Sequence, residues 1–424
     1  MIGTVLHMIS YAEALALLHA HVATLTSEWV ASADAEGRVL ADALSSPAEL
    51  PPFDNSAMDG FALATAGAGA LADSEHVVSG TVAAGQDAGA AATGAAWEIM
   101  TGAGVPASAD AVVPIEQVQI LEHDGERPCR ILLRQPVRTG QHIRRRGEDV
   151  SLHDRVIEAG TVVRGAHLML LAGLGCARVQ VVRRPRVALI ATGRELIGNP
   201  AQPLQPGQIH DGTSSYLLSQ LRAAGADVVW RGQVGDDDAA FDAALAQARD
   251  AGADLILSTG AVSRGRYDFI PDALARNAAA LLFHKVAVRP GKPVLLARFG
   301  DGALYVGLPG NPMASAAGLR FFVEPAVRAL LGMPLERSLR VALETPMQAR
   351  PIWRQHLRAR LLCSAAGELS VQILPQQESF RVVPLLQANV WAVLEPQDEG
   401  AAPSTHAEVF GLGHLQPAAP AITP

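Results

Sequence analysis

Cysteine, lysine and long apolar runs are scarce in this sequence of 424 residues, and each scarcity excludes a class of protein. Three widely spaced cysteines without a C-x-x-C pair predict neither a disulfide framework nor a zinc site, so we expect a protein of the reducing cytoplasm. Uncharged apolar runs of about 18 residues are missing, which excludes a membrane-spanning helix. The excess of 42 acidic over 34 basic residues gives a net charge of −8 and argues against general affinity for nucleic acid or an anionic membrane.

Only two of the 34 basic residues are lysines, and both, Lys285 and Lys292, lie in the segment 284–293. Lysine supplies a compact, rotatable point charge that the planar guanidinium group of arginine cannot copy. An arginine-biased gene in which two lysines fall together by chance is the alternative explanation. Because the two lysines flank a Pro-Gly turn, we favour a site for an anionic ligand at this segment.

The N-terminal stretch is expected to form a helix rather than a secretory signal. It contains no Lys or Arg before Arg38, and Glu13 interrupts its apolar residues. Ser10 and Glu13 have the spacing of a capping box ahead of apolar residues at helical intervals, which predicts a helix to about Val22. A second short helix is expected over 166–172.

The length predicts about two to four domains. Short Val, Ile and Ala runs broken by Gly, Pro, Asn and Asp predict a β-rich domain over 47–139. This domain is inserted into a discontinuous helical and extended domain formed by residues 1–46 and 140–182. Short alternating strands predict a small, barrel-like β domain over 336–424.

Residues 183–335 alternate between apolar strands and amphipathic helices, which predicts an α/β domain with a doubly wound, mostly parallel sheet. Asp211 is expected to cap one of its helices. The expected strands are 186–191, 227–234, 254–257, 283–288, 294–299 and 304–306, and the last helix is 313–331.

Ligands of open α/β sheets bind beyond the carboxyl ends of the strands. Four segments at those ends, 192–195, 235–237, 258–263 and 307–312, are rich in Gly, Ser, Thr and Asp. Each segment alone is typical of any strand-to-helix turn, but four at one edge beside two lysines predict a phosphate-bearing ligand. The P-loop and dinucleotide fingerprints are both missing, which weakens the kinase and dehydrogenase interpretations.

Carboxylates in glycine-flanked loops offer ligands for Mg²⁺, which usually takes one or two protein carboxylates together with phosphate oxygens. Asp59, Asp149, Asp236 and Asp268 occur in such loops, whereas Asp237 is better explained as a helix cap.

Arg354, Arg358 and Arg360 alternate along an expected strand and therefore share one face. They form either a solvent-exposed stripe or a pocket for an oxyanion, since guanidinium groups match oxyanion geometry.

Seven ordered motifs together resemble the molybdopterin molybdenumtransferase family, called MoeA in bacteria and the gephyrin E domain in animals. They occur in order and span nearly the whole chain, which argues strongly against a chance match. The motifs are PPFDNSAMDG (51–60), MTGA (100–103), GED (147–149), ATGREL (191–196), STGAVS (258–263), KVAVRPGKP (285–293) and GLPGNP (307–312).

The resemblance implies an elongated homodimer of four-domain chains, in which 1–46 and 140–182 form the dimerisation domain and 183–335 has the MogA-like molybdopterin-binding fold. It implies an active site in a cleft between subunits. The implied reaction is the last step of molybdenum cofactor biosynthesis, in which adenylylated molybdopterin and molybdate are converted, with Mg²⁺, to molybdenum cofactor and AMP. Other proteins of this biosynthesis are implied as partners.

Matching positions imply the functional residues. The implied catalytic residues are Asp59, Thr101, Asp149, Glu195, Asp236, Asp268, Lys285 and Arg289. Of these, Asp149, Asp236 and Asp268 are implied to hold Mg²⁺. Residues implied to bind the ligands are Thr192, Gly193, Ser258, Gly260, Ser263, Lys292, Pro309, Gly310, Asn311, Pro312, Arg358 and Ser379, with Arg358 and Ser379 associated with molybdate.

The chain departs from the family pattern at a few positions. Ala261 replaces a glycine, Arg289 stands where some members have lysine, and the segment 377–384 lacks the glycine before Ser379 and the serine pair after it. A catalytically silent scaffold that binds molybdopterin or a partner protein is therefore the alternative to an enzyme. Retention of the cleft carboxylates and both lysines favours the enzyme. A generic nucleotide-dependent phosphotransferase would need a fingerprint that the chain lacks.

Overall fold

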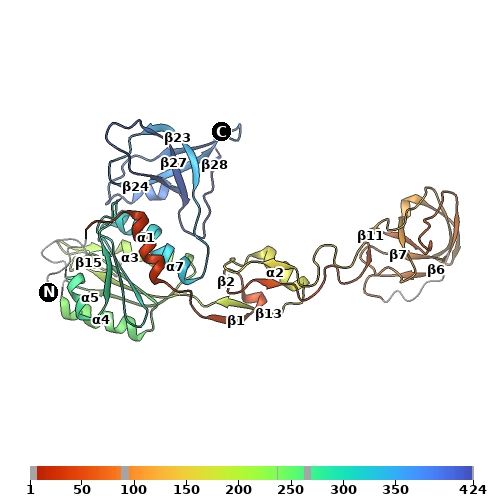
Figure 1. Ribbon diagram of the computed structural model, residues 1–424, viewed down its shortest axis with the longest axis horizontal. Coiled ribbons are helices and arrows are strands. Elements are labelled where there is room, and N and C mark those ends of the chain that lie inside the picture. Colours follow the sequence, from red (N-terminus) through yellow and green to blue (C-terminus); the bar gives the residue numbers. More distant parts are fainter. Residues whose placement is uncertain (1–6, 87–94, 236, 262–268, 423–424) are drawn as a thin grey trace.

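The protein is elongated, and its four parts are strung along the molecule (Figure 1). The structure is a computed structural model that describes residues 7–86, 95–235, 237–261 and 269–422. An α/β body and a β-barrel lie together at one end, a slender middle part follows, and a β-rich insertion lies at the far end (Figure 1). Among the described helices, none has the length and apolar character needed to span a bilayer.

The first helix, α1 (Tyr11–His21), has the capping box that the sequence predicts, because Ser10 accepts from the Glu13 amide and Glu13 accepts from the Ser10 amide. Its Ala14 and Leu18 are buried in the core of the α/β body, against α7. The helix therefore fastens the N-terminal stretch to the α/β body.

The middle part is a small sheet of order β1-β13-β2 covered by α2, with a core around Val179 and Leu171. Two short antiparallel ladders, β3–β12 and β4–β11, carry the chain out to the insertion and back. The elements are β1 (Ser27–Ala31), η1 (Ser32–Asp34), β2 (Val39–Leu40), β3 (Leu44–Ser45), β4 (Asn55–Ser56), β11 (Ile143–Arg144), β12 (Arg155–Ile157), α2 (Gly165–Gly173) and β13 (Arg178–Val182).

The insertion is a curved sheet whose described strands have the order β8-β5-β7-β6-β10-β9. Strand β5 is buried on both faces, with Phe61 and Leu63 in one apolar cluster and Ala62 in another. Its elements are β5 (Gly60–Leu63), β6 (Glu75–Val82), β7 (Ala95–Ile99), β8 (Ala111–Pro114), η2 (Ile115–Gln117), β9 (Val118–Asp124) and β10 (Arg127–Leu133).

The α/β body confirms the predicted fold class. Its sheet has the order β17-β14-β18-β22-β21-β19, in which the first four strands are parallel and the last two pairings are antiparallel. Helices α3, α6 and α7 cover one face, and α4 and α5 cover the other. The elements are β14 (Arg186–Thr192), β15 (Leu196–Ile197), β16 (Ile209–His210), α3 (Gly212–Ala223), β17 (Asp227–Val234), α4 (Asp238–Asp250), β18 (Leu255–Thr259), α5 (Ile270–Arg276), β19 (Ala280–His284), β21 (Leu295–Arg298), β22 (Leu304–Leu308), α6 (Pro312–Gly318) and α7 (Glu324–Leu330).

Two predicted elements of this body differ in the structure. The expected strand 283–288 is divided, because Lys285 has φ +77 and turns the chain out of the sheet between β19 and β20 (Val288–Arg289). The expected single helix 313–331 contains a π-helical turn over Leu319–Val323 between α6 and α7. Helix C-caps, turns and apolar periodicity do not predict either feature.

The C-terminal part is a closed barrel, because β24 pairs with both β25 and β26 in the order β24-β25-β23-β27-β26. Strand β20 leaves the α/β body and pairs with the edge of β24, which ties the two parts together. The elements are β23 (Leu339–Met347), β24 (Arg354–Cys363), β25 (Leu369–Ile373), α8 (Val383–Gln387), β26 (Val390–Leu394), β27 (Ser404–Gly411) and β28 (Ala421–Ile422).

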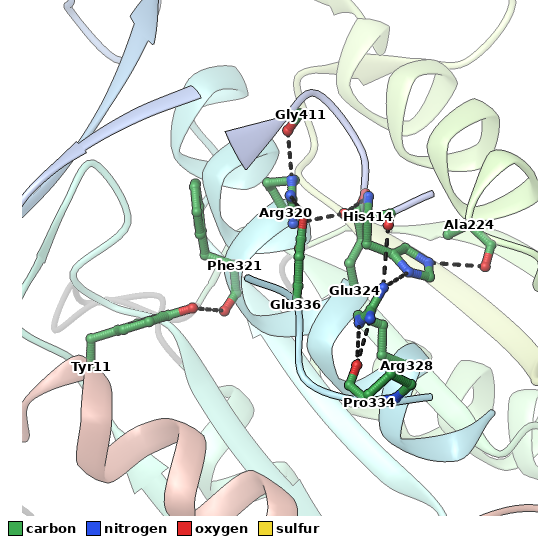
Figure 2. A network of polar contacts seen from close by, with 10 residues as sticks. All are labelled: Tyr11, Ala224, Arg320, Phe321, Glu324, Arg328, Pro334, Glu336, Gly411 and His414. Carbon is green, nitrogen blue, oxygen red and sulfur yellow. Dashed lines mark hydrogen bonds and ion pairs between the residues drawn. The ribbon is translucent and has the colours of Figure 1, made fainter. Parts of the chain in front are cut away.

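A buried polar network also joins the barrel to the α/β body (Figure 2). Arg320, in the π-helical turn, donates to the Gly411 carbonyl at 2.9 Å and to Glu336 at 2.6 Å. Glu324 accepts from the His414 amide at 2.8 Å and lies 3.3 Å from Arg320. Arg320, Glu324 and His414 are buried, Glu336 is half-buried, and all four are partnered, so they fix the barrel firmly against the α7 side of the body.

Candidate active site

A cavity of about 520 Å³ lies at the carboxyl edge of the parallel strands. The loops that follow β14, β18 and β22 form one side of it. Strands β14 and β18 are neighbours in the sheet. In the chain, the next strand of this sheet after β14 is β17, which pairs with the other side of β14 at the edge of the sheet. The cavity therefore opens at the topological switch point, where ligands of open α/β sheets bind.

Glycines allow the two loops at the switch point to approach each other. Gly260 has φ +84, and a Cβ there would lie 2.6 Å from Thr192 Oγ1 and 2.9 Å from the Thr192 carbonyl oxygen. The Thr192 hydroxyl donates to the Thr259 carbonyl at 2.6 Å, which locks the loops together. Ala261, next in the chain, has φ +52, a conformation that favours glycine. A side chain at Gly260 would push these loops apart.

The opposite wall comes from helix N-termini and from the barrel. Asp211 caps α3 by accepting from the Ser214 amide at 2.9 Å, and Tyr216 of the same helix lines the cavity. Pro312 begins α6, and Val382 and Leu385 reach over from the barrel. Backbone N–H groups at the N-terminus of α3 favour a bound anion, whereas the aromatic and aliphatic side chains suit a flat apolar group.

Several of the sequence-predicted residues line this cavity. They are Thr192, Gly193, Glu195, Gly260, Gly310 and Pro312. Pro309 and Asn311 lie in the same loop as Gly310, with Asn311 at the N-cap of α6. Ser258 differs, because it is fully buried below the loop and accepts a hydrogen bond from the Tyr305 hydroxyl. We therefore place Ser258 in the support of the loop and not on the cavity wall.

The lysine segment forms a strap between the α/β body and the barrel. Lys292 lies with its Nζ 5.4 Å from the ring centre of Trp353, and Arg289 is paired with Gln355 in the β20–β24 ladder. A Cβ on Gly291 would lie 3.6 Å from the Ala314 carbonyl oxygen, so this strap passes close to α6. Lys285, Arg289 and Lys292 are not among the residues that line the cavity.

The three alternating arginines of β24 do not form a common stripe or a common pocket. Arg354 and Arg358 are buried, so a solvent-exposed stripe is the wrong interpretation. Arg354 pairs with Glu395 and Glu408, whereas Arg360 donates to the Gln387 carbonyl at 2.9 Å. Each arginine serves a different local contact.

Arg358 holds the loop that carries Ser379. Its guanidinium group, in a residue that is 2% exposed, donates to the carbonyls of Gln376 at 3.1 Å and Arg381 at 2.9 Å. The Ser379 carbonyl in turn accepts from the Met313 amide at 2.9 Å, at the beginning of α6. Arg358 on β24 therefore holds the loop that contains Ser379, and this loop leads into Val382 on the barrel side of the cavity.

Asp59 and Thr101 come together elsewhere, at the base of the insertion, and the backbone of the 147–149 motif bonds to residues 50 and 51. Asp59 accepts from the Thr101 amide at 2.7 Å and from its hydroxyl at 2.9 Å, and these hydrogen bonds lower the pKa of Asp59. The Asp149 amide donates to the Leu50 carbonyl at 2.9 Å, and the Gly102 amide donates to the Ser56 carbonyl at 2.8 Å. Three motifs of the N-terminal half thus share one exposed junction around β4 and β11.

This junction and the cavity are far apart within one chain. Figure 1 shows β11 at the insertion end and α3 with β15 at the opposite end of the molecule. Asp236, Ser263 and Asp268 lie outside the described residues. Of the predicted magnesium ligands only Asp149 is described, and the described residues contain no cluster of three or more His, Cys, Asp or Glu able to hold a metal ion.

Sequence reasoning missed the part of the wall that does not come from the strand ends. Those residues are Leu196, Ile209, His210, Gly212, Thr213, Tyr216, Met313, Val382 and Leu385. The cap at Asp211 was a usable signal, because it places the N-terminus of α3 at the edge of the sheet. The barrel residues have no such signal, since only the folded chain brings them to α6.

Comparisons with known proteins agree with this geometry. Residues 9–175 match the MoeA N-terminal region (domain I and II), and residues 188–329 match a probable molybdopterin binding domain. The molybdopterin molybdenumtransferase of Synechococcus elongatus is 36% identical over 420 residues, covering 96% of this chain and 100% of the relative. The molybdopterin molybdenumtransferase of Bacillus subtilis is 37% identical, covering 87% of this chain and 86% of the relative.

Among solved structures, the molybdopterin biosynthesis MoeA protein of Pyrococcus horikoshii has a TM-score of 0.79 at 25% identity, covering 95% of this chain and 99% of that chain. The likeness thus extends over the α/β body, the middle part, the insertion and the barrel. Since relatives of more than 30% identity are covered almost completely, the chain belongs to the molybdopterin molybdenumtransferase family of transferases.

Proposed function

We propose that the protein inserts molybdate into adenylylated molybdopterin and releases AMP, in a magnesium-dependent reaction that completes the molybdenum cofactor. The observation that carries this proposal is the cavity at the switch point of the α/β body. Its volume of about 520 Å³ suits a small organic molecule, and its wall combines glycine-rich backbone with Tyr216, Ile209 and Met313. A flat pterin fits the apolar side, and phosphate groups fit the N-terminus of α3.

The chemistry demands that several anions be brought together. Molybdate is a dianion, and the adenylylated substrate carries a pyrophosphate group, so the two repel each other. Lys285, Arg289 and Lys292, on the strap beside α6, supply positive charge that offsets this repulsion. Bound Mg²⁺ would neutralise the pyrophosphate. The carboxylates of Glu195 at the cavity and of Asp59 and Asp149 at the insertion junction are the polar groups available to orient the ligands.

We propose a two-fold homodimer in which the insertion junction of one copy completes the cavity of the other. The separation of the two half-sites within one chain supports this arrangement, because neither half has both the enclosure and all the implied residues. The middle part, from 1–46 and 140–182, is the proposed dimerisation surface. Trp29 is 57% exposed and Met169 is 76% exposed on that part, and large apolar side chains of this kind favour burial in an interface.

The deciding experiment mixes the purified protein with adenylylated molybdopterin, magnesium chloride and molybdate, and measures AMP by chromatography. We expect AMP release that depends on molybdate. A protein that binds molybdopterin but releases no AMP would refute the proposal and support the silent scaffold instead.

A further inference from the structure

Gln377 lies on the turn after β25, and its side-chain amide forms hydrogen bonds with three atoms of Arg358. Its Oε1 accepts from the backbone amide of Arg358 at 3.1 Å and from the side-chain Nε at 3.2 Å. Its Nε2 donates to the Arg358 carbonyl at 2.9 Å and to the Leu374 carbonyl at 2.7 Å. One side-chain amide therefore contacts both the main chain and the guanidinium group of the same arginine.

The amide of Gln377 takes the place of a peptide unit in the barrel. The β24–β25 ladder ends at the pair Ala359 and Ile373, and Leu374 is the last residue whose amide donates to β24. A primary amide has the same donor and acceptor groups as a peptide, so Gln377 continues the ladder by one step after β25 has left the sheet. This explains the contacts with the main chain of Arg358 but not the contact with Nε.

The contact with Nε fixes the direction of the guanidinium group. With Nε held by Gln377, the two terminal nitrogens point at the carbonyls of residues 376, 378 and 381. Those carbonyls belong to the loop that carries Ser379 and is bonded to Met313 at the start of α6. A change in the direction of the guanidinium group would thus shift this loop, which leads into Val382 on the cavity wall.

We propose that Gln377 is a positioning residue for the oxyanion of this reaction. It sets the direction of Arg358 and, through Arg358, the position of the Ser379 loop that leads into the cavity wall at Val382. The inference rests on the proposed function, because it assigns Gln377 to the molybdate side of that reaction.

Asn389 provides a matched control, because its side-chain amide also bonds to the main chain of β24. Its Oδ1 accepts from the Leu361 amide at 2.8 Å, and its Nδ2 donates to the Leu361 carbonyl at 3.0 Å. This amide extends the β26–β24 ladder in the same way, three residues further along β24, and contacts no charged side chain in the described residues. Replacing Asn389 removes a comparable set of main-chain hydrogen bonds without releasing Arg358.

The experiment compares Gln377→Met with Asn389→Leu in the full-length protein. Both variants lose hydrogen bonds to β24, so both should show a lower melting temperature. Only Gln377→Met should raise the KM for molybdate, on the order of tenfold, with little change in the KM for adenylylated molybdopterin. Calorimetry with molybdate alone should show the same loss of affinity in the absence of turnover.

Two outcomes overturn the inference while leaving the proposed function intact. The first is a wild-type enzyme that releases AMP while Gln377→Met keeps the wild-type KM for molybdate. The second is an equal rise in that KM for Asn389→Leu, since it would show that any loosening of β24 has this effect. A wild-type protein that shows no molybdate-dependent AMP release refutes the proposed function, and the inference with it.

Discussion

The cavity of the α/β body and the exposed junction at the base of the insertion are built by opposite means. The cavity is enclosed by loops that lie very close to each other and are held by buried hydroxyl groups, as at Gly260 and Thr192. The junction is a surface held by short ladders and by ion pairs such as Arg145 with Asp54, at 2.6 Å between exposed groups. Enclosure can bind and orient a ligand, whereas an exposed set of carboxylates can act only when another surface covers it. The difference is the one that our dimer proposal requires, in which the two are halves of one site.

The largest expected effect comes from two variants, one that disables the junction half of the proposed site and one that disables its cavity half. Asp149→Asn and Lys285→Ala should each abolish AMP release while leaving the circular dichroism spectrum unchanged, because Asp149 is exposed and Lys285 lies in a loop outside the strands. After unfolding and refolding as an equal mixture, about half of the dimers carry one copy of each variant, and one of their two sites is wild type. The mixture should therefore recover about a quarter of wild-type activity.

Failure to recover activity in the mixture would show that each site is completed within one chain, which would contradict the dimer proposal. The control is a mixture of Asp149→Asn with wild type. It should keep about half of wild-type activity, which shows that unfolding and refolding leave the intact sites active.

A second, smaller effect compares the enclosed cavity with the exposed junction. Each contains a glycine with a similar positive φ. Gly260 has φ +84 at the cavity, and Gly102 has φ +78 at the junction, where an added Cβ would meet no atom within 4 Å. Gly102→Ala should cost about 1 kcal/mol of stability, from backbone strain alone. Gly260→Ala should cost about 2–3 kcal/mol, because its Cβ also clashes with Thr192.

Thermal unfolding measures both variants, and ligand affinity sharpens the comparison. Gly260→Ala should also weaken molybdopterin binding, since relief of the clash moves the cavity loops. Equal losses of stability in the two variants would mean that the cavity loops are as free to move as the surface junction.

Elements with local signals were predicted from the sequence nearly to the residue. The capping box predicted α1, the cap at Asp211 predicted α3, and the strand 227–234 coincides with β17. Strand β27 was missed because its reason is not local. Its alternating Ala407 and Val409 are buried only because β23 and β26 pair with it and close the barrel.

The candidate site divides in the same way. Loops at strand ends are predictable because parallel strands end at a common edge, and six residues predicted there line the cavity. The buried positions of Ser258 and Arg358 were not predictable, since they depend on Tyr305 and on the 376–381 loop, which lie far along the chain. The sequence alone does not show whether a serine or arginine in a motif faces a ligand or supports the residue that does.

The last expected effect concerns acid, which should loosen the enclosed end before the exposed one. Burial, and then the charge of Arg328, lower the pKa of His414 to about 3, and its Nε2 lies 3.1 Å from the Ala224 carbonyl oxygen. Between about pH 3 and the ordinary histidine value near 6.5, the unfolded chain holds a proton that the folded chain lacks. Stability is therefore lost as the pH falls through this range, by up to about 1.4 kcal/mol per pH unit.

At the junction, hydrogen bonds lower the pKa of Asp59, so its contribution is lost only below the ordinary aspartate range. Burial raises the pKa of Glu324 to about 8. Glu324 therefore changes the stability with pH in the direction opposite to His414. A variant that tests His414 must leave Glu324 unchanged. His414→Gln does so, and its amide can still donate to Ala224. Its melting temperature should fall less than that of the wild type between pH 7 and pH 5. Parallel melting curves would show that the barrel contact does not depend on a neutral His414, and would remove this distinction between the two ends.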